Sequence, residues 1–402
     1  MKDKPTLPQT NHGNHKKAFL FIILLGVVSL FGDITYEGAR SVTGPFLSTL
    51  GASAAVVGLI AGLGEFLGYA LRLASGYLAD RTGRYWLLVF IGYGVLLTLP
   101  MLALAPCWQV AAVFIVSERM GKAIRTPARD TILSHSTKQV GRGWGFGIHE
   151  ALDQVGAIAG PLIFTGVIYL NLGVRTGFGV LIVPAILTLF FLSIARSKFP
   201  SPEKLEISST HKEAGDAKLS KVFWMYTLFS FISVAGLANF QLISYHFKVE
   251  SVVSDIQIPT LYAIAMGVDA VVALIIGKVY DRVGLISLVT IPLLTLPIPL
   301  LAFSHSHGAA VASIVLWGMV MGIQETVMRA AIADLTPIRR RGTAYGIFNT
   351  AYGGAWLLGG VVMGLLYEIS IGYIFAFVLV LEAISIPLII KVKRAVLLNS
   401  KH

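Results

Sequence analysis

The sequence contains little charge. Asp, Glu, Lys and Arg make up only 13% of its 402 residues, whereas a typical soluble domain carries roughly 25%. Apolar residues make up 55%, and the mean hydropathy is +0.75. A chain this apolar cannot cover itself with polar surface, so we expect an integral membrane protein. The shortage of charge excludes a soluble enzyme, a nucleic-acid-binding protein and a disordered regulator.

Cysteine and the sequence motifs of enzymes are also scarce. Cys107 is the only cysteine, which excludes an intrachain disulfide and a thiolate metal cluster. The sequence has no H-E-x-x-H, no phosphate-binding glycine loop and no G-x-S-x-G. Its nine histidines are scattered. We therefore expect no enzyme, no metal site and no cofactor.

A cleavable signal peptide is not expected either. Residues 1–17 are polar, and the apolar run from Ala18 to about Leu50 is far longer than the apolar region of a signal. No small-residue cleavage site interrupts this run early. We therefore expect it to remain as the first transmembrane helix.

The chain is rich in apolar stretches long enough to cross a bilayer core, which takes about 20 residues per helix. Twelve are predicted, at 18–49, 52–79, 85–105, 108–127, 142–170, 174–195, 221–247, 257–280, 284–303, 308–333, 341–367 and 371–391. The one long polar break, 196–220, contains prolines, serines and mixed charge, and indicates a linker. The predicted organisation is a tail (1–17), a six-helix bundle (18–195), the linker, a second six-helix bundle (221–391) and a tail (392–402).

Lysine and arginine predict the orientation. With the N-terminus inside, the cytoplasmic pieces hold about 26 of the 32 basic residues, and the outside loops hold only Arg175 and Lys248. We expect a multi-pass protein of the inner membrane with both termini cytoplasmic. This asymmetry also explains the net charge of +11; a surface for anionic ligands is the less favoured alternative.

The two halves repeat each other. The sequence Gly-Tyr-Leu-Ala-Asp-Arg-Thr-Gly-Arg at 76–84 returns in weaker form at 277–284, with its aspartate 201 positions later. Three glycines, Gly143, Gly147 and Gly160, recur 199 positions later. Two parallel six-helix repeats joined by a linker are typical of one transporter architecture.

At these residues the chain resembles the major facilitator superfamily in its twelve-helix form. The family signature between helices 2 and 3 is close to G-x-L-a-D-r-x-G-r. The residues that match it are Gly76, Asp80, Arg81, Gly83 and Arg84, and the second copy keeps Asp281 and Arg282. The resemblance covers the whole chain. It implies two pseudo-symmetric halves, alternating access, and no enzymatic activity.

The resemblance also implies a role for Asp80. This carboxylate would sit against the start of helix 11, whose dipole favours an anion, and the contact would hold one access state shut. Gly76 would let two helices approach closely. The alternative is that Asp80 and Arg81 form only a loop ion pair.

Helix 5 contains Gly156-Ala-Ile-Ala-Gly160-Pro161. This segment resembles a motif of proton-coupled drug antiporters in the family, g-x-x-x-G-P-x-x-G-G. Phe164 and Thr165 stand where the last two glycines belong. A kink packed on glycines is the alternative interpretation.

Charges inside predicted membrane helices are the candidate site, because each costs at least about 2.5–3.5 kcal/mol at the bilayer centre. Predicted helices 3, 6 and 9 have no charge in their apolar interiors, and helix 12 has only Glu382. The charged residues therefore cluster on helices that the family resemblance places around a central cavity. The predicted cavity residues are Asp33, Glu37, Arg40, Glu65, Glu118, Arg119, His149, Asp153, Gln241, Asp269, Glu325 and Arg329.

Several of these charges have partners at helical spacing. The pairs three or four residues apart are Glu37–Arg40, Glu118–Lys122 and Glu325–Arg329. Glu65 and Arg72 lie two turns apart and would be bridged through neighbours. Arg119 follows Glu118 directly and is predicted to point across the bundle. We interpret these first as salt bridges in the cavity wall.

Three acids, Asp33, Asp153 and Asp269, lack a basic partner on their own helix. Such carboxylates are candidate proton carriers, and His149, one turn before Asp153, has the spacing of a proton relay. The alternatives are a packing role for His149 and cross-cavity bridges from Asp33 and Asp269 to arginines.

Two further groups accompany the cavity. Tyr36 and other aromatic residues on the same helices are candidates to stack on a flat or cationic ligand, with packing as the alternative. Lys122, Arg125 and Arg129 form a basic stripe on helix 4, which we interpret as a cytoplasmic gate or a contact for lipid phosphate.

The predicted cavity helices carry eight acids and four clearly membrane-embedded bases. We therefore expect a secondary active transporter, embedded in lipid, that exports a small cationic or amphipathic compound by alternating access, with protons as the coupling ion. The family resemblance implies that it works as a monomer. The alternative is a proton symporter for a small anionic metabolite or a metal chelate, favoured by Arg40 and Arg119. A non-transporting sensor on a transporter fold would not need the motif at 76–84.

Overall fold

The computed structural model describes residues 12–140, 142–202, 219–336 and 341–399. The side chains of Asp80, Asp281, Arg329 and residues 141–147 lie outside what it describes. Throughout the described ranges the regular structure is helical. This confirms the predicted all-α membrane class.

The N-terminal half comprises six membrane segments. They are α1 (His12–Thr49), α2 (Ala54–Thr82), α3 (Tyr85–Gly94) with the tighter turns η1 (Val95–Thr98) and η2 (Pro100–Leu104), α4 (Trp108–Val140), α5 (Arg142–Tyr169), and α6 (Val174–Val180) with α7 (Ile182–Lys198).

The C-terminal half repeats this plan with more interruptions. Its segments are α8 (Lys221–Ala235) with α9 (Phe240–Val249), α10 (Gln257–Val283), η4 (Gly284–Val289) with α11 (Thr290–Thr295) and α12 (Ile298–Ala302), α13 (His307–Ile323) with the π-helical turn η5 (Gln324–Met328) and α14 (Arg329–Leu335), α15 (Arg341–Ile369), and α16 (Ile371–Asn399).

Within the described residues, eleven helical segments are long and apolar enough to cross a membrane. The remaining predicted segment, 108–127, corresponds to α4, which carries charges such as Glu118, Arg119 and Arg125 along its length. It packs against both α2 and α3, so its charges face other helices. These charges lower the mean hydropathy of α4. Ion pairs such as Arg119 with Glu65 offset the cost of burying them.

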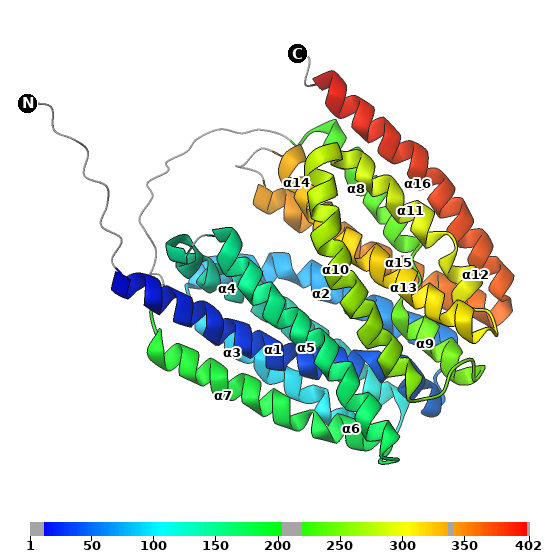
Figure 1. Cartoon of the computed structure of the whole chain (residues 1–402), viewed down its shortest axis with the longest axis horizontal. Coiled ribbons are helices and arrows are strands. Elements are labelled where there is room, and N and C mark those ends of the chain that lie inside the picture. Colours follow the sequence, from blue (N-terminus) through cyan, green and yellow to red (C-terminus); the bar gives the residue numbers. More distant parts are fainter. Residues whose placement is uncertain (1–11, 141, 203–218, 337–340, 400–402) are drawn as a thin grey trace, which may run out of the picture.

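The halves lie side by side, with the N-terminal half at lower left in Figure 1 and the C-terminal half at upper right. Both described termini lie at the edge where the halves diverge, which we call the terminal side. Among the described residues, the halves are joined mainly by α2 with α15, α5 with α10 and α1 with α9, and also by α2 with α9 and α1 with α10. The opposite edge we call the far side.

Glycines allow the halves to meet closely toward the far side. A Cβ on Gly58 would lie 2.1 Å from the carbonyl oxygen of Gly360, and one on Gly44 would lie 2.1 Å from that of Gln241. Any larger residue would push these backbones apart. Thr165 and Thr260 join α5 to α10 by a hydrogen bond of 3.0 Å.

The predicted helix 221–247 is interrupted, which corrects the expectation of one continuous helix. The chain leaves α8 at Gly236 and begins α9 at Asn239, whose side chain accepts from the backbone N–H of Leu242 at 2.8 Å. Trp317 Nε1 donates to the Ala238 carbonyl at 3.0 Å. These bonds satisfy backbone groups that a membrane helix cannot leave open.

The fourth predicted segment continues past Pro127 to Val140. Proline has no N–H to bond the carbonyl of Ala123, and the Ser75 hydroxyl on α2 bonds that carbonyl instead, at 2.7 Å. The neighbouring helix therefore lets α4 pass through its proline. This lengthening brings the last part of the basic stripe toward the space between the halves.

Candidate functional site

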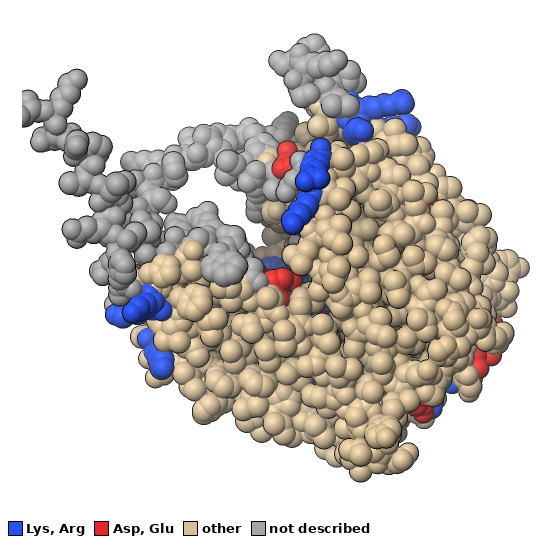
Figure 2. Space-filling view, viewed as in Figure 1, with Lys and Arg blue, Asp and Glu red and all other residues tan. Residues whose placement is uncertain are grey.

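A cavity of about 200 Å³ lies between the two halves. Figure 2 shows the molecule hollowed there, with acidic side chains visible at the opening on the terminal side. Twelve charged residues line this central cavity. The acids are Asp33, Glu37, Asp130, Glu150, Asp153, Asp269 and Glu325, and the bases are Arg40, Arg72, Lys122, Arg125 and Arg129.

Six of the twelve predicted cavity residues line this space, namely Asp33, Glu37, Arg40, Asp153, Asp269 and Glu325. His149 is buried beside Asp153, with Nδ1 3.6 Å from Oδ2. Glu65 binds two arginines. Glu118, Arg119 and Gln241 line a second, smaller chamber. The side chain of Arg329 lies outside the described residues.

Glu65 on α2 binds two guanidinium groups. One carboxylate oxygen, Oε1, lies 3.1 Å from Arg40 of α1 and 2.5 Å from Arg119 of α4. Arg40 also lies 3.7 Å from Glu37. All these side chains are at most 12% exposed. Arg119 therefore points across the bundle, as predicted, and reaches Glu65. Glu65 pairs with Arg40 and Arg119, whereas the sequence spacing suggested a link to Arg72 through neighbours.

Glu118 binds Arg125, two turns further along α4, and not Lys122 as the four-residue spacing predicts. Both terminal nitrogens of Arg125 lie 3.2–3.3 Å from one Glu118 oxygen, and one also donates to the Gly92 carbonyl at 3.3 Å. A guanidinium offers several donors in one plane, so it satisfies a buried carboxylate better than an ammonium group.

Lys122 instead lies over the ring of Tyr36, with Nζ 3.9 Å from the centroid. Arg119 lies 4.4 Å from the same centroid. The ring is 3% exposed. The protein's own cations therefore occupy Tyr36, which argues against its predicted role in stacking on a ligand.

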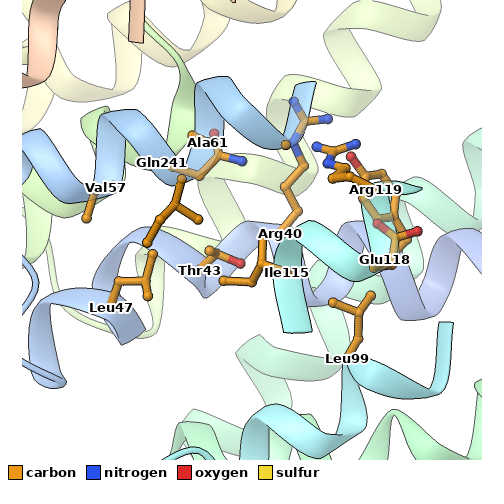
Figure 3. Close-up of a pocket in the computed structure, with 13 residues that line it drawn as sticks. Arg40, Thr43, Leu47, Val57, Ala61, Leu99, Ile115, Glu118, Arg119 and Gln241 are labelled. Carbon is orange, nitrogen blue, oxygen red and sulfur yellow. The ribbon is translucent and has the colours of Figure 1, made fainter. Parts of the chain in front are cut away.

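The second chamber lies beyond the Glu65 ion pairs. It has a volume of about 20 Å³ and is lined mainly by apolar residues of α1, α2 and α4, with Gln241 from α9. Figure 3 shows Arg40 and Arg119 toward one end and Leu47 and Val57 toward the other. Arg40, Thr43 and Leu47 follow each other along α1 toward its far-side end at Thr49. Because Arg40 lines both spaces, the paired arginines separate them.

A hydrogen bond between the halves closes the central cavity beside this partition. Tyr262 on α10 donates from its hydroxyl to Glu37 on α1 at 2.6 Å. Both residues are buried. This bond and the glycine contacts close the cavity toward the far side, and the cavity opens toward the terminal side (Figure 2).

Three acids of the cavity have no ion pair with a lysine or arginine in the described part of the chain, and Asp153 has His149 as its neighbour. Among the described residues, no lysine or arginine lies within ion-pair distance of Asp33, Glu150 or Asp153. Asp33 and Asp153 act on each other electrostatically, and Lys122 acts on both. Glu150 is exposed. The arrangement concentrates negative charge on α1 and α5.

The basic stripe of α4, Lys122, Arg125 and Arg129, lines the central cavity; its predicted role as a gate or lipid contact stays a prediction. Arg129 donates to Asp130 at 3.0 Å and to the Ser29 hydroxyl at 2.9 Å. The three-and-four spacing of the stripe was visible in the sequence. Its placement was not, because it depends on α4 continuing through Pro127.

The motif at 76–84 has a structural explanation at two positions. Gly83 ends α2 with a φ of 62°, and its N–H bonds the Ala79 carbonyl at 2.9 Å; glycine adopts this φ at little cost. A Cβ on Gly76 would lie 3.5 Å from Pro127, so α2 and α4 are close there. Arg81, Arg84 and Arg282 are exposed. The contact between Asp80 and helix 11 stays a prediction.

Twelve helical segments in two halves around a charged, one-sided cavity define a membrane transporter. A model of the Major Facilitator Superfamily matches residues 22–324 and 242–401. The chain belongs to this superfamily, as its motif predicted, and it is a transporter and not an enzyme.

Relatives and solved structures agree with this assignment. The chain is 39% identical to an uncharacterized protein of Mycobacterium tuberculosis over 94% of this chain and 93% of that one. It is 29% identical to an uncharacterized MFS-type transporter of Methanocaldococcus jannaschii, covering 94% and 96%. The fold is similar to a mutant of the nucleoside transporter NupG, with a TM-score of 0.74, 14% identity and coverage of 93% and 99%.

Proposed function

We propose that this transporter exports a small cationic or amphipathic compound in exchange for protons. The observation that supports this most is the set of three cavity acids, Asp33, Glu150 and Asp153, that have no ion pair with a described lysine or arginine. The neighbouring arginines are each engaged, Arg40 by Glu65, Arg125 by Glu118 and Arg129 by Asp130. The net attraction of the cavity is therefore for a cation.

The proposed cycle follows from competition for these carboxylates. A cation entering from the terminal side would bind between Asp33 and Asp153. Rocking of the halves would open the far side, where protonation of the same acids would release the cation. We propose that the terminal side is cytoplasmic in the inner membrane, as the distribution of lysine and arginine favours, and that the monomer is sufficient.

A second candidate is a proton symporter for a small anion or metal chelate. Lys122 supports it, since its ammonium group lies in the cavity with no described carboxylate within ion-pair distance. An anion would bind to Lys122, and protons would neutralise the acids. The two candidates differ in which side of the membrane the compound must occupy.

The test is proton movement in proteoliposomes with an imposed pH gradient, with candidate cations, organic acids and metal chelates added one at a time. We expect addition of a transported cation to trigger proton movement across the membrane. Asp33→Asn should reduce this proton flux about 100-fold, as expected for loss of an essential proton-transfer group. Asp255→Asn, which alters an exposed far-side pair with Lys248, is the matched control. Transport of a cation with no proton movement would refute the coupling, and proton uptake with an anion would favour the second candidate.

A further inference from the structure

One carboxyl group is buried far from the central cavity. Glu382 lies on α16, which packs against α8 on the outer part of the C-terminal half (Figure 1). Its exposed fraction is 0%. Its Oε2 accepts hydrogen bonds from Ser385 of the same helix at 2.8 Å and from Ser233 of α8 at 3.2 Å.

Among the described residues, the surroundings of Glu382 contain no counter-ion. From the elements packed against α16 (α8, α11, α12, α15 and η4), no described Lys, Arg, His, Asp or Glu acts on it electrostatically, and its polar neighbours are the two serine hydroxyls. The second oxygen, Oε1, is buried and has no partner among the described residues. An ionised carboxylate with only hydroxyl partners costs far more to bury than the neutral acid.

Glu382 also lies where the seventh membrane segment breaks. Ser233 is in the last turn of α8, and Gly236 ends that helix. A Cβ on Gly236 would lie 2.6 Å from Glu382 Oε1, so the carboxyl group fills the space that a side chain would need. The end of a helix carries partial negative charge on its free carbonyls, which opposes an ionised carboxylate there.

From this geometry we infer that Glu382 is a proton-binding site outside the central cavity, and that its protonated form holds the break between α8 and α9 as seen here. The break sets the position of α9, whose Gln241 carbonyl meets Gly44 at a close contact between the two halves. Loss of the proton would place a charge against the end of α8 and loosen this contact. Proton occupancy at Glu382 therefore favours the conformation closed at the far side.

The first experiment measures the proton directly and needs no substrate. Infrared spectra of the purified protein at neutral pH are compared for wild type, Glu382→Gln and the matched exposed variant Glu250→Gln. We expect a carbonyl-stretching band of a neutral carboxylic acid that disappears in Glu382→Gln and persists in Glu250→Gln. Asp33→Asn should keep it, which separates this site from the cavity. Identical spectra for wild type and Glu382→Gln would mean that Glu382 is ionised, and would overturn the inference.

The second experiment measures the conformation. In a Cys107→Ser background, Thr260→Cys reports on the far-side contact with Thr165, by labelling with a membrane-impermeant maleimide. We expect labelling of otherwise wild-type protein to rise several-fold as pH is raised, and the same protein with Glu382→Gln to stay weakly labelled throughout. Equal pH dependence in both would overturn the inference.

Two further arms keep the second experiment decisive. Glu382→Leu, which replaces the acid by an apolar residue, should behave as Glu382→Gln if a neutral side chain is what the break requires. Replacing Na⁺ by K⁺ should change nothing. Labelling that follows Na⁺ and not pH would mean that a metal cation occupies the site, which also overturns the inference. Because neither experiment uses a transported compound, failure of the proposed export activity would leave both results interpretable.

Discussion

The two halves of this transporter share a plan but divide their features unequally. Among the described residues, the N-terminal half contributes ten of the twelve charged side chains that line the central cavity, and the C-terminal half contributes Asp269 and Glu325. The C-terminal half has more interruptions in its helices, among them the break between α8 and α9 and the π-helical turn η5. The difference teaches that the charge lining the cavity comes mainly from one half, while the other half has more interruptions in its membrane helices.

The ion pairs of Glu65 test how far the N-terminal half depends on its charges. Glu65→Gln removes the carboxylate shared by Arg40 and Arg119 and leaves two buried guanidinium groups without it. We expect a loss of stability of about 3–5 kcal/mol, measured by thermal unfolding of the purified protein. Asp130→Asn breaks a more exposed pair with Arg129 and should cost at most about 1 kcal/mol. Equal losses of stability in the two variants would mean that burial does not determine how much an ion pair contributes.

The glycine contacts test whether the halves must meet closely. Gly58→Ala places a Cβ against the Gly360 carbonyl, so α2 and α15 must separate, at a cost of about 1–3 kcal/mol. We expect slower transport and greater maleimide labelling of far-side cysteines. Gly166→Ala is the control, since no atom lies within 4 Å of its Cβ position. Normal transport by Gly58→Ala would show that the halves need not meet this closely.

The bond between Tyr262 and Glu37 tests communication between the halves. Tyr262→Phe removes one hydrogen bond to a carboxylate, worth about 1.5 kcal/mol. The expected result is a roughly tenfold shift toward the state open at the far side, seen as faster labelling there. Tyr352→Phe removes a bond to Gln324 within the C-terminal half and should leave the labelling unchanged. A similar shift from both variants would mean that the effect is not specific to the bond between halves.

The cap of α9 tests the irregular helices of the C-terminal half. Asn239→Ala removes the side chain that bonds the Leu242 N–H, which we expect to cost about 1 kcal/mol. Hydrogen exchange of the amides that begin α9 should increase. Ser53→Ala removes the corresponding cap of α2, where the bond is longer at 3.4 Å and exposed, and should have a smaller effect. No change in hydrogen exchange at α9 would mean that the start of α9 does not depend on this cap.

The agreement between sequence and structure is good for the helices and weaker for the contacts. Eleven apolar segments were visible because a membrane helix needs a long apolar run, and α4 was found despite its charges. The break at 236–239 was missed, since the same apolar composition suits one helix or two. The extension of α4 past Pro127 was missed because it depends on Ser75 of another helix.

Pairing of charges shows the same limit. Sequence spacing suggested Glu118 with Lys122, but Glu118 binds Arg125. The same spacing predicted that His149 and Asp153 lie together, and in the structure His149 Nδ1 is 3.6 Å from Asp153 Oδ2. Spacing along one helix decides which groups share a face, whereas the choice among several groups on that face depends on the neighbouring helices.

By itself, the sequence determined the membrane class, the number of segments, the twofold repeat and the family, because these depend on local hydropathy and on motifs within single helices. Only the tertiary structure decided that Glu65 holds two arginines, that three acids of the cavity have no ion pair with any described lysine or arginine, and that Glu382 lies against a broken helix. Each of these joins residues that are distant in the chain. The physical reason is that the cost of burying a charge depends on its neighbours in space, which helix packing alone brings together.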